Sequence, residues 1–108
     1  MKYDIVKTWK MPEHEYAQCK ILEREDGTLL LQSYNTIVVS ISKDGWMDCT
    51  GIYSRTTIKH IGWFMRNYGH GCTYFDAKWA WMHDSCVNVL TGEVLTYEEY
   101  NKKFAEIA

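Results

Sequence analysis

The chain has 108 residues, of which 46% are hydrophobic and 15% aromatic, and its formal net charge is −2 at pH 7. This length predicts one domain, residues 1–108, that can bury enough apolar surface to fold alone and leaves no room for a second core. A net charge this small excludes a protein that imitates DNA by charge alone.

The first ten residues lack the apolar run of a secretory signal, and no later stretch is long and apolar enough to suggest a membrane span. We therefore expect a cytoplasmic protein that makes no contact with a membrane. In a reducing compartment the four cysteines are free thiols or metal ligands rather than disulfides.

The first half of the chain has the pattern of an antiparallel β-meander. Residues 18–25 and 28–34 flank Asp26-Gly27, and an Asp-Gly pair between two apolar runs is typical of a tight hairpin. A second turn, residues 43–45, precedes a strand candidate at residues 46–53. Alternating apolar residues mark two further strands; they are Tyr3, Ile5 and Trp9, and then Ile37, Val39 and Ile41.

A helix is expected over residues 54–68. Ser54 can cap its first turn, and Gly69 can end it. Gly62 inside this helix predicts close packing against another backbone, because glycine otherwise weakens a helix. The apolar side chains of this helix recur on one face; they are Ile58, Ile61, Met65 and Tyr68.

The last third predicts a strand, a hairpin and a helix. Thr91-Gly92 marks the hairpin, and Thr96 with Glu99 has the spacing of a capping box for a helix over residues 96–107. The strand is expected where apolar residues alternate, at Phe75, Ala77, Trp79 and Trp81. Together these elements predict an α+β fold, an antiparallel β-sheet with two main helices packed on one face.

Two short His/Cys pairs suggest a metal site. His70 and Cys72 are followed after ten residues by His83 and Cys86, and two thiolates with two imidazoles are the ligands of a closed, structural Zn²⁺ site. Cys49 or His60 could replace one member of the four. The alternative is that both cysteines are small buried apolar residues and both histidines lie in loops.

No catalytic apparatus is recognisable. The sequence has no nucleophile elbow, no phosphate-binding loop and no metal-plus-glutamate motif, so we expect a protein that binds and is not an enzyme. Residues 49–75 contain no acid, and the helix at residues 55–68 carries Lys59, His60 and Arg66 beside Trp63. This basic and aromatic helix suits single-stranded nucleic acid, although its positive charge is sparse.

Two segments carry a resemblance to a known family. Ser33-Tyr34-Asn35-Thr36 and the motif Y-S-x-T-T-x-x-H-I at residues 53–61 resemble small phage and mobile-element proteins of Gram-positive bacteria. The resemblance covers residues 28–68. It implies shared roles for one set of residues, which we interpret as helix capping and docking onto the sheet; they are Tyr53, Ser54, Thr56, Thr57 and His60.

Small acidic proteins of such elements often disable host defences, and among them this chain looks most like streptococcal phage inhibitors of the type II-A CRISPR nuclease. This resemblance implies a function, inhibition of a host RNA-guided nuclease by direct protein–protein contact in the host cytoplasm. Such nucleases hold nucleic acid in positively charged channels that an acidic surface can obstruct. The alternative function is a small nucleic-acid-binding regulator that uses the helix at residues 55–68.

Overall fold

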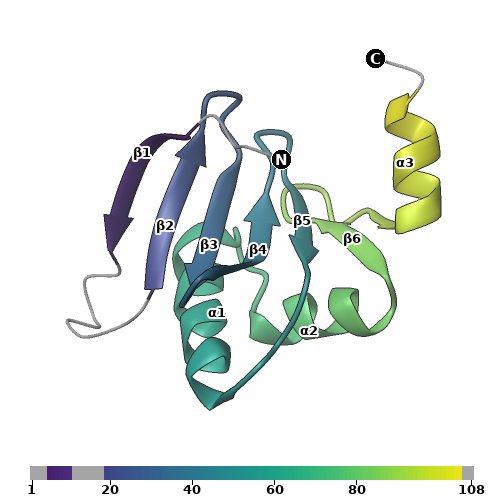
Figure 1. Ribbon diagram of the computed structural model, residues 1–108. Helices are drawn as coiled ribbons and strands as arrows, with labels where there is room; N and C mark the ends of the chain where they lie inside the picture. The colour runs from purple at the N-terminus through teal and green to yellow at the C-terminus, as the bar shows by residue number, and fades with distance from the viewer. Residues whose placement is uncertain (1–4, 11–18, 106–108) are drawn as a thin grey trace.

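The protein is a single seven-stranded antiparallel sheet with three helices, seen in a computed structural model that describes residues 5–10 and 19–105 (Figure 1). Each strand pairs with its neighbour in sequence, in the order β1 to β7. The predicted α+β class and the meander are confirmed. The first five strands are β1 (Ile5–Lys10), β2 (Cys19–Arg24), β3 (Leu29–Ser33), β4 (Thr36–Ile41) and β5 (Trp46–Cys49).

Hairpin chemistry explains the pairing of the first half. In the β2–β3 turn the backbone N–H of Thr28 donates to Asp26 Oδ1 at 2.9 Å, and Gly27 has φ +89°. Gly45, with φ +97°, turns the chain between β4 and β5, and a Cβ there would lie 2.7 Å from Asn88 Oδ1. Both positions require glycine, which fixes the register of the strands that follow.

One face of the sheet holds the core. Ile21, Leu31 and Val39 lie side by side across β2, β3 and β4, and all three are almost completely buried. Two helices cover this face, α1 (Arg55–Tyr68) over β3 and α2 (Tyr74–Met82) over β5 and β6. The two helices form one layer on this side of the sheet (Figure 1).

The third helix lies on the other face. Trp46 alternates with core residue Met47 along β5, so its ring points away from α1 and α2, and it contacts Tyr100 and Phe104 at centroid distances of 5.7 and 6.1 Å. Both rings belong to α3 (Tyr97–Ala105). Two helices thus share one face of the sheet, as predicted, but they are α1 and α2, and the helix expected near residues 96–107 lies on the other face.

The motif that begins at Tyr53 joins α1 to the sheet. The backbone N–H of Thr57 donates to the Ser54 hydroxyl at 3.2 Å, which is the predicted cap. Ser33 on β3 lies 2.9 Å from Nδ1 of His60 and 3.3 Å from the Thr57 hydroxyl, and all three side chains are buried. Capping and docking onto the sheet account for Ser54, Thr57 and His60, whereas Tyr53 and Thr56 are exposed.

Gly62 does not serve the purpose expected from the sequence. A Cβ built there meets nothing within 4 Å among the described residues, so the predicted close approach of another backbone is absent from that part of the chain. Gly62 faces outward in the middle of α1.

The predicted strand at residues 75–81 is wrong, because this segment is helix α2. Thr73 and Asp76 form a capping box: the N–H of Thr73 donates to Asp76 Oδ2 at 2.7 Å, and the N–H of Phe75 donates to the Thr73 hydroxyl at 3.2 Å. Ala77 and Ala80 are the buried side of α2, and their small side chains bring the helix close to β5 and β6.

The C-terminal elements follow the prediction. Strands β6 (Ser85–Asn88) and β7 (Val94–Thr96) form the hairpin around Gly92. Reciprocal bonds between Thr96 and Glu99, of 2.9 and 3.1 Å, confirm the capping box of α3. The predictions that involve Tyr3, residues 11–18 and residues 106–107 lie outside the described part of the chain. Within that part, no helix combines the length and the apolarity needed to cross a bilayer.

Candidate functional site

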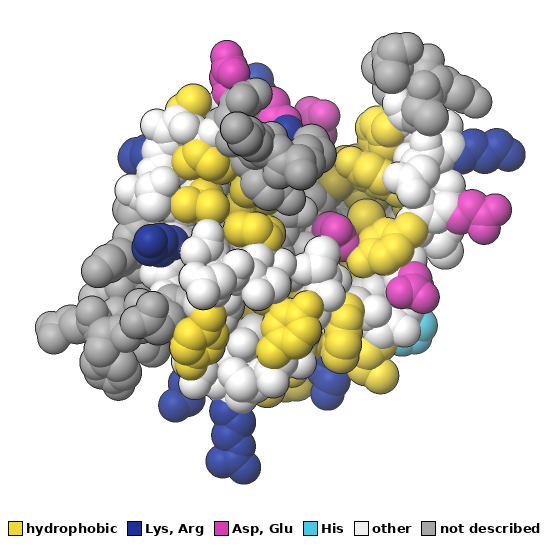
Figure 2. Space-filling view, in the orientation of Figure 1, with side chains coloured by type: hydrophobic (Ala, Val, Ile, Leu, Met, Phe, Trp, Pro, Cys, Tyr) yellow, Lys and Arg dark blue, Asp and Glu magenta, His cyan; other side chains and the backbone are white. Residues whose placement is uncertain are grey.

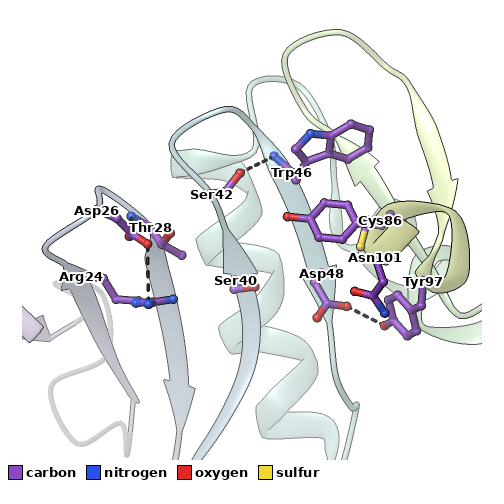
Figure 3. A pocket seen from close by; sticks show the side chains of 11 residues that line it. Arg24, Asp26, Thr28, Ser40, Ser42, Trp46, Asp48, Cys86, Tyr97 and Asn101 are labelled. Atoms are coloured by element: carbon purple, nitrogen blue, oxygen red, sulfur yellow. Dashed lines mark hydrogen bonds and ion pairs between the residues drawn. The ribbon is translucent and has the colours of Figure 1, made fainter. Parts of the chain in front are cut away.

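A cavity of about 510 Å³ lies between the open face of the sheet and α3. We call it the groove. Its volume falls within the range of about 300–1,000 Å³ that is usual for binding pockets. Figure 3 shows its walls: the β2–β3 hairpin and β4 on one side, β5 and β6 at the base, and α3 on the other. The lining residues are Arg24, Asp26, Thr28, Ser40, Ser42, Trp46, Asp48, Cys86, Tyr97, Tyr100 and Asn101.

The carboxylate of Asp48 lies at the base of the groove. Asp48 follows Trp46 by two residues on β5 and pairs with Ser40 on β4, so both side chains face the groove. The Tyr97 hydroxyl donates to Asp48 Oδ1 at 2.5 Å, from α3 (Figure 3). Burial raises the pKa of Asp48, and this hydroxyl acts in the opposite direction. Tyr97 itself stays protonated, because burial and the Asp48 carboxylate raise its pKa.

The far wall carries a pair of charges that offset each other. Arg24 Nη2 lies 3.6 Å from Asp26 Oδ2, and the backbone N–H of Thr28 lowers the pKa of Asp26. Within residues 5–10 and 19–105, no ion pair involves Asp48. The Asp48 carboxylate is therefore the uncompensated charge among the described lining residues.

Cys86 does not have the properties of an activated nucleophile. Its side chain is 4% exposed, and burial, with a smaller contribution from Asp48, raises its pKa to about 12. A thiol with this pKa is almost entirely protonated at neutral pH, and the thiolate is the nucleophilic form. Burial likewise raises the pKa of Cys19 to about 12 and that of Cys49 to about 11.

The four predicted zinc ligands lie in different surroundings. Cys86 lines the groove, whereas Cys72 packs against the core on the helix side of the sheet. His83 ends α2, where its ring stacks on Trp79 at 4.3 Å and its Nδ1 lies 2.8 Å from the Trp79 carbonyl oxygen. His70 is exposed in the turn after α1. The four side chains thus do not converge.

The substitute ligands do not complete such a site either. His60 is held by Ser33, and the Cys49 thiol lies 3.9 Å from the Gly51 carbonyl oxygen in the core. No cluster of three or more His, Cys, Asp or Glu suited to a metal occurs within the described ranges. A zinc ion bound by His70, Cys72, His83 and Cys86 would require the chain to rearrange around β6, and it stays a prediction.

The basic helix differs from its expected form. Trp63 is 4% exposed and His60 is 1% exposed, so neither ring is available to stack on a nucleobase. Lys59 and Arg66 are exposed, as expected. The aromatic partners that the nucleic-acid hypothesis placed on α1 therefore belong to the core.

Sequence reasoning missed the groove because its walls come from five different elements. No sequence motif contains Asp48, and Tyr97 and Tyr100 have the spacing of a buried helix stripe rather than of a binding site. The available signal was the alternation of Trp46 and Asp48 with Met47 and Cys49, which places an aromatic ring and a carboxylate together on the face opposite the core.

The chain belongs to DUF8033, a family of unknown function, whose model matches residues 4–78. This range contains β1 to β5, α1 and the first part of α2, so β6, β7 and the α3 wall of the groove lie beyond it. No curated protein matches the chain. No solved structure matches it either.

Proposed function

We propose that this protein acts by binding another protein, and that the groove captures an arginine side chain of that partner. The observation that carries the proposal is the Asp48 carboxylate at the base of the groove. It is half-buried, has the Tyr97 hydroxyl as its hydrogen-bond donor, and forms no ion pair within the described residues. A carboxylate in such a place favours a ligand that brings a positive charge.

The other lining groups suit a guanidinium. This group has five N–H donors in a planar fork and no acceptor, so it binds where acceptors surround it. Ser40 pairs with Asp48 across β4 and β5, and the side chains of Thr28 and Asn101 present further oxygen atoms in the same groove. The rings of Trp46 and Tyr100, which contact each other at a centroid distance of 5.7 Å, both line the groove and can pack against a flat cation. An ammonium would use fewer of these acceptors.

A binding role without catalysis is part of the proposal. The thiol in the groove has a raised pKa, and the groove holds no histidine that could act as a general base among its described lining residues. The groove groups are fixed by one another: Trp46 packs on Tyr100, and Tyr97 bonds Asp48. Such preorganisation lowers the entropy that is lost when a partner binds.

A host type II RNA-guided nuclease, in the cytoplasm of a bacterium, remains our specific candidate for the partner. The nucleic-acid channels of such nucleases are rich in basic side chains, which are the partner groups that the groove is proposed to bind. We favour this over the nucleic-acid regulator because an uncompensated carboxylate repels phosphate. Inhibition would follow from occupying a positive surface, with no turnover by this protein.

Titration with N-acetyl-arginine-N-methylamide, followed by ¹H–¹⁵N NMR, tests the groove directly. We expect millimolar binding with chemical-shift changes confined to β4, β5 and α3, and none with the citrulline analogue, which has the same shape without the charge. Asp48→Asn should abolish the response. Glu98→Gln removes a charge from an exposed position of α3 outside the groove and should leave it unchanged. Equal responses to arginine and citrulline would refute capture of a guanidinium.

A cleavage assay tests the identity of the partner separately. Inhibition of one type II nuclease in a panel, lost in Asp48→Asn and kept in Glu98→Gln, would support the nuclease as the partner. If the groove binds arginine but every nuclease cuts its target normally, the partner is another protein. Salt-sensitive binding to DNA or RNA that persists in Asp48→Asn would favour the nucleic-acid regulator instead.

A further inference from the structure

A second surface, on the opposite side of the sheet, has the composition of a docking site. The outward face of α2 carries three large apolar side chains, Phe75, Trp79 and Met82, which are 73%, 42% and 62% exposed. Their spacing of four and three residues places them on one stripe of the helix. The buried side of the same helix has only the small residues Ala77 and Ala80. Tyr74 packs partly against the core, and the other large apolar side chains of α2 face solvent.

Trp79 is held in position before any partner arrives. The His83 ring stacks on it with 4.3 Å between centroids and an angle of 17° between the planes. The His83 Nδ1 and the Trp79 carbonyl oxygen, 2.8 Å apart, fix the histidine in turn. An exposed tryptophan with a fixed rotamer loses little entropy on binding, which is the property of an interface anchor.

The outward face of α1, next to α2, is basic. Arg55, Lys59 and Arg66 are exposed and recur at intervals of four and seven residues, which places them on one stripe with Gly62 between them. No acidic residue lies in α1. Each stripe is opposite the buried side of its own helix, and the helices lie in one layer, so both stripes face away from the sheet. Figure 2 shows Lys and Arg side chains along this lower, helix side of the molecule.

We propose that the surface formed by these two stripes, the α1–α2 face, binds an amphipathic helix of a partner protein whose apolar stripe is bordered by acidic residues. The apolar stripe of α2 has the spacing with which helices pack on helices, and the basic stripe of α1 provides the complementary charge. The α1–α2 face and the groove lie on opposite sides of the sheet. The protein can therefore hold two partners, or two parts of one partner, at the same time.

Two features argue that the occupant is not a second copy of this chain. The exposed parts of the three apolar side chains amount to roughly 350 Å², less than half of the ~800 Å² per partner that a stable interface buries. Lys78 is exposed beside the centre of the stripe, so a symmetric pairing of two α2 helices would bring two lysines together. A single acidic helix brings no second lysine, and it needs only the smaller contact area of a transient complex.

Fluorescence anisotropy with a designed peptide tests this proposal. The probe is a labelled helical peptide with leucines at intervals of three and four residues and glutamates on both borders of that stripe. We expect it to bind in a salt-dependent way and to quench tryptophan fluorescence. A peptide with lysines in place of the glutamates, and a scrambled acidic peptide, should bind weakly.

The variants assign the binding to this face. Trp79→Gln should weaken binding about tenfold or more, and the double change Arg55→Glu, Lys59→Glu should weaken it and remove its salt dependence. Val6→Ser, which removes an exposed apolar residue of β1, is the matched control and should bind normally. Because all these side chains are exposed, the variants should keep the far-UV circular dichroism of the parent. Asp48→Asn should also bind normally, which separates this surface from the groove.

Three results would overturn the proposal. Equal binding of the acidic and basic peptides would show that charge complementarity plays no part. Self-association in sedimentation equilibrium that Trp79→Gln abolishes would identify a second copy as the occupant. Binding of an oligothymidylate strand that competes with the peptide and is lost in Trp79→Gln would identify single-stranded nucleic acid instead.

Discussion

Replacement of Gly62 by alanine should stabilise the protein. Gly62 occupies an α-helical position in the middle of α1, and a Cβ there meets nothing within 4 Å among the described residues. Glycine in a helix interior is about 0.8–1.0 kcal/mol less favourable than alanine, mainly because it gains more backbone freedom on unfolding. Gly62→Ala should therefore raise the free energy of unfolding by about 1 kcal/mol and the melting temperature by about 4 °C.

Urea denaturation followed by tryptophan fluorescence measures this change. The slope of the free energy of unfolding against urea concentration should be the same in the parent and the variant. Gly92 is the matched control. A Cβ at Gly92 also meets nothing within 4 Å, but its φ is +80°, a conformation that alanine adopts only with strain. Replacement of glycine by alanine should therefore stabilise the protein at position 62 and destabilise it by about 1 kcal/mol at position 92. A loss of stability in Gly62→Ala would refute the argument and indicate close packing at Gly62, as the sequence first suggested.

Four further outcomes are expected. Thr96→Ala removes the cap of α3 and should lower the free energy of unfolding by about 1 kcal/mol, as measured in urea. Tyr97→Phe leaves the Asp48 carboxylate without its hydroxyl donor and should cost about 1–2 kcal/mol at pH 7 in the same assay. Because the pKa of Asp48 is raised in the folded protein, ionisation of Asp48 lowers the free energy of unfolding as the pH rises from the ordinary aspartate range to the raised value. Asp48→Asn lacks this loss, so its stability relative to the parent should increase across that pH range. Melting curves recorded over a pH series check the sign. The zinc prediction expects about one metal ion per chain in untagged protein, lost in Cys72→Ser; elemental analysis that finds no metal would contradict it.

The elements with explicit local signals were predictable. Asp26-Gly27 specifies its hairpin because glycine tolerates the positive φ of the turn, and the pair Thr96 and Glu99 specifies the start of α3 because each satisfies a free N–H of the other. Such signals act over a few residues and do not depend on the rest of the fold. These signals can therefore be recognised in the sequence alone.

Helix α2 was not predictable by the same reasoning, because its apolar pattern is inverted. Phe75, Trp79 and Trp81 are among its exposed residues, and two alanines form its buried side, so alternation of apolar residues imitated a strand. The local signal that predicts a helix here is the capping box of Thr73 with Asp76. A helix whose large apolar side chains face outward departs from core packing, which is itself a reason to look for a partner there.

The face to which α3 docks could not be read locally either. The stripe of Tyr97, Tyr100 and Phe104 is apolar on one side of the helix, but nothing in those residues says which side of the sheet receives it. Trp46 decides the matter, because its ring faces away from the core and offers α3 an aromatic contact. The groove forms because this long-range contact between Trp46 and α3 places the helix over the open face of the sheet.

The order of the sheet also bears on how the protein assembles. Strands β2 to β5 pair with their sequence neighbours through tight turns, whereas β5 and β6 are separated by residues 50–84, which include α1 and α2. Closing that long loop is the slowest kind of pairing, so β6, β7 and α3 are expected to dock last. In hydrogen exchange the amides of β6 and β7 should then open before those of β2 to β4. The protein would lose its groove by partial unfolding while most of the sheet remains intact.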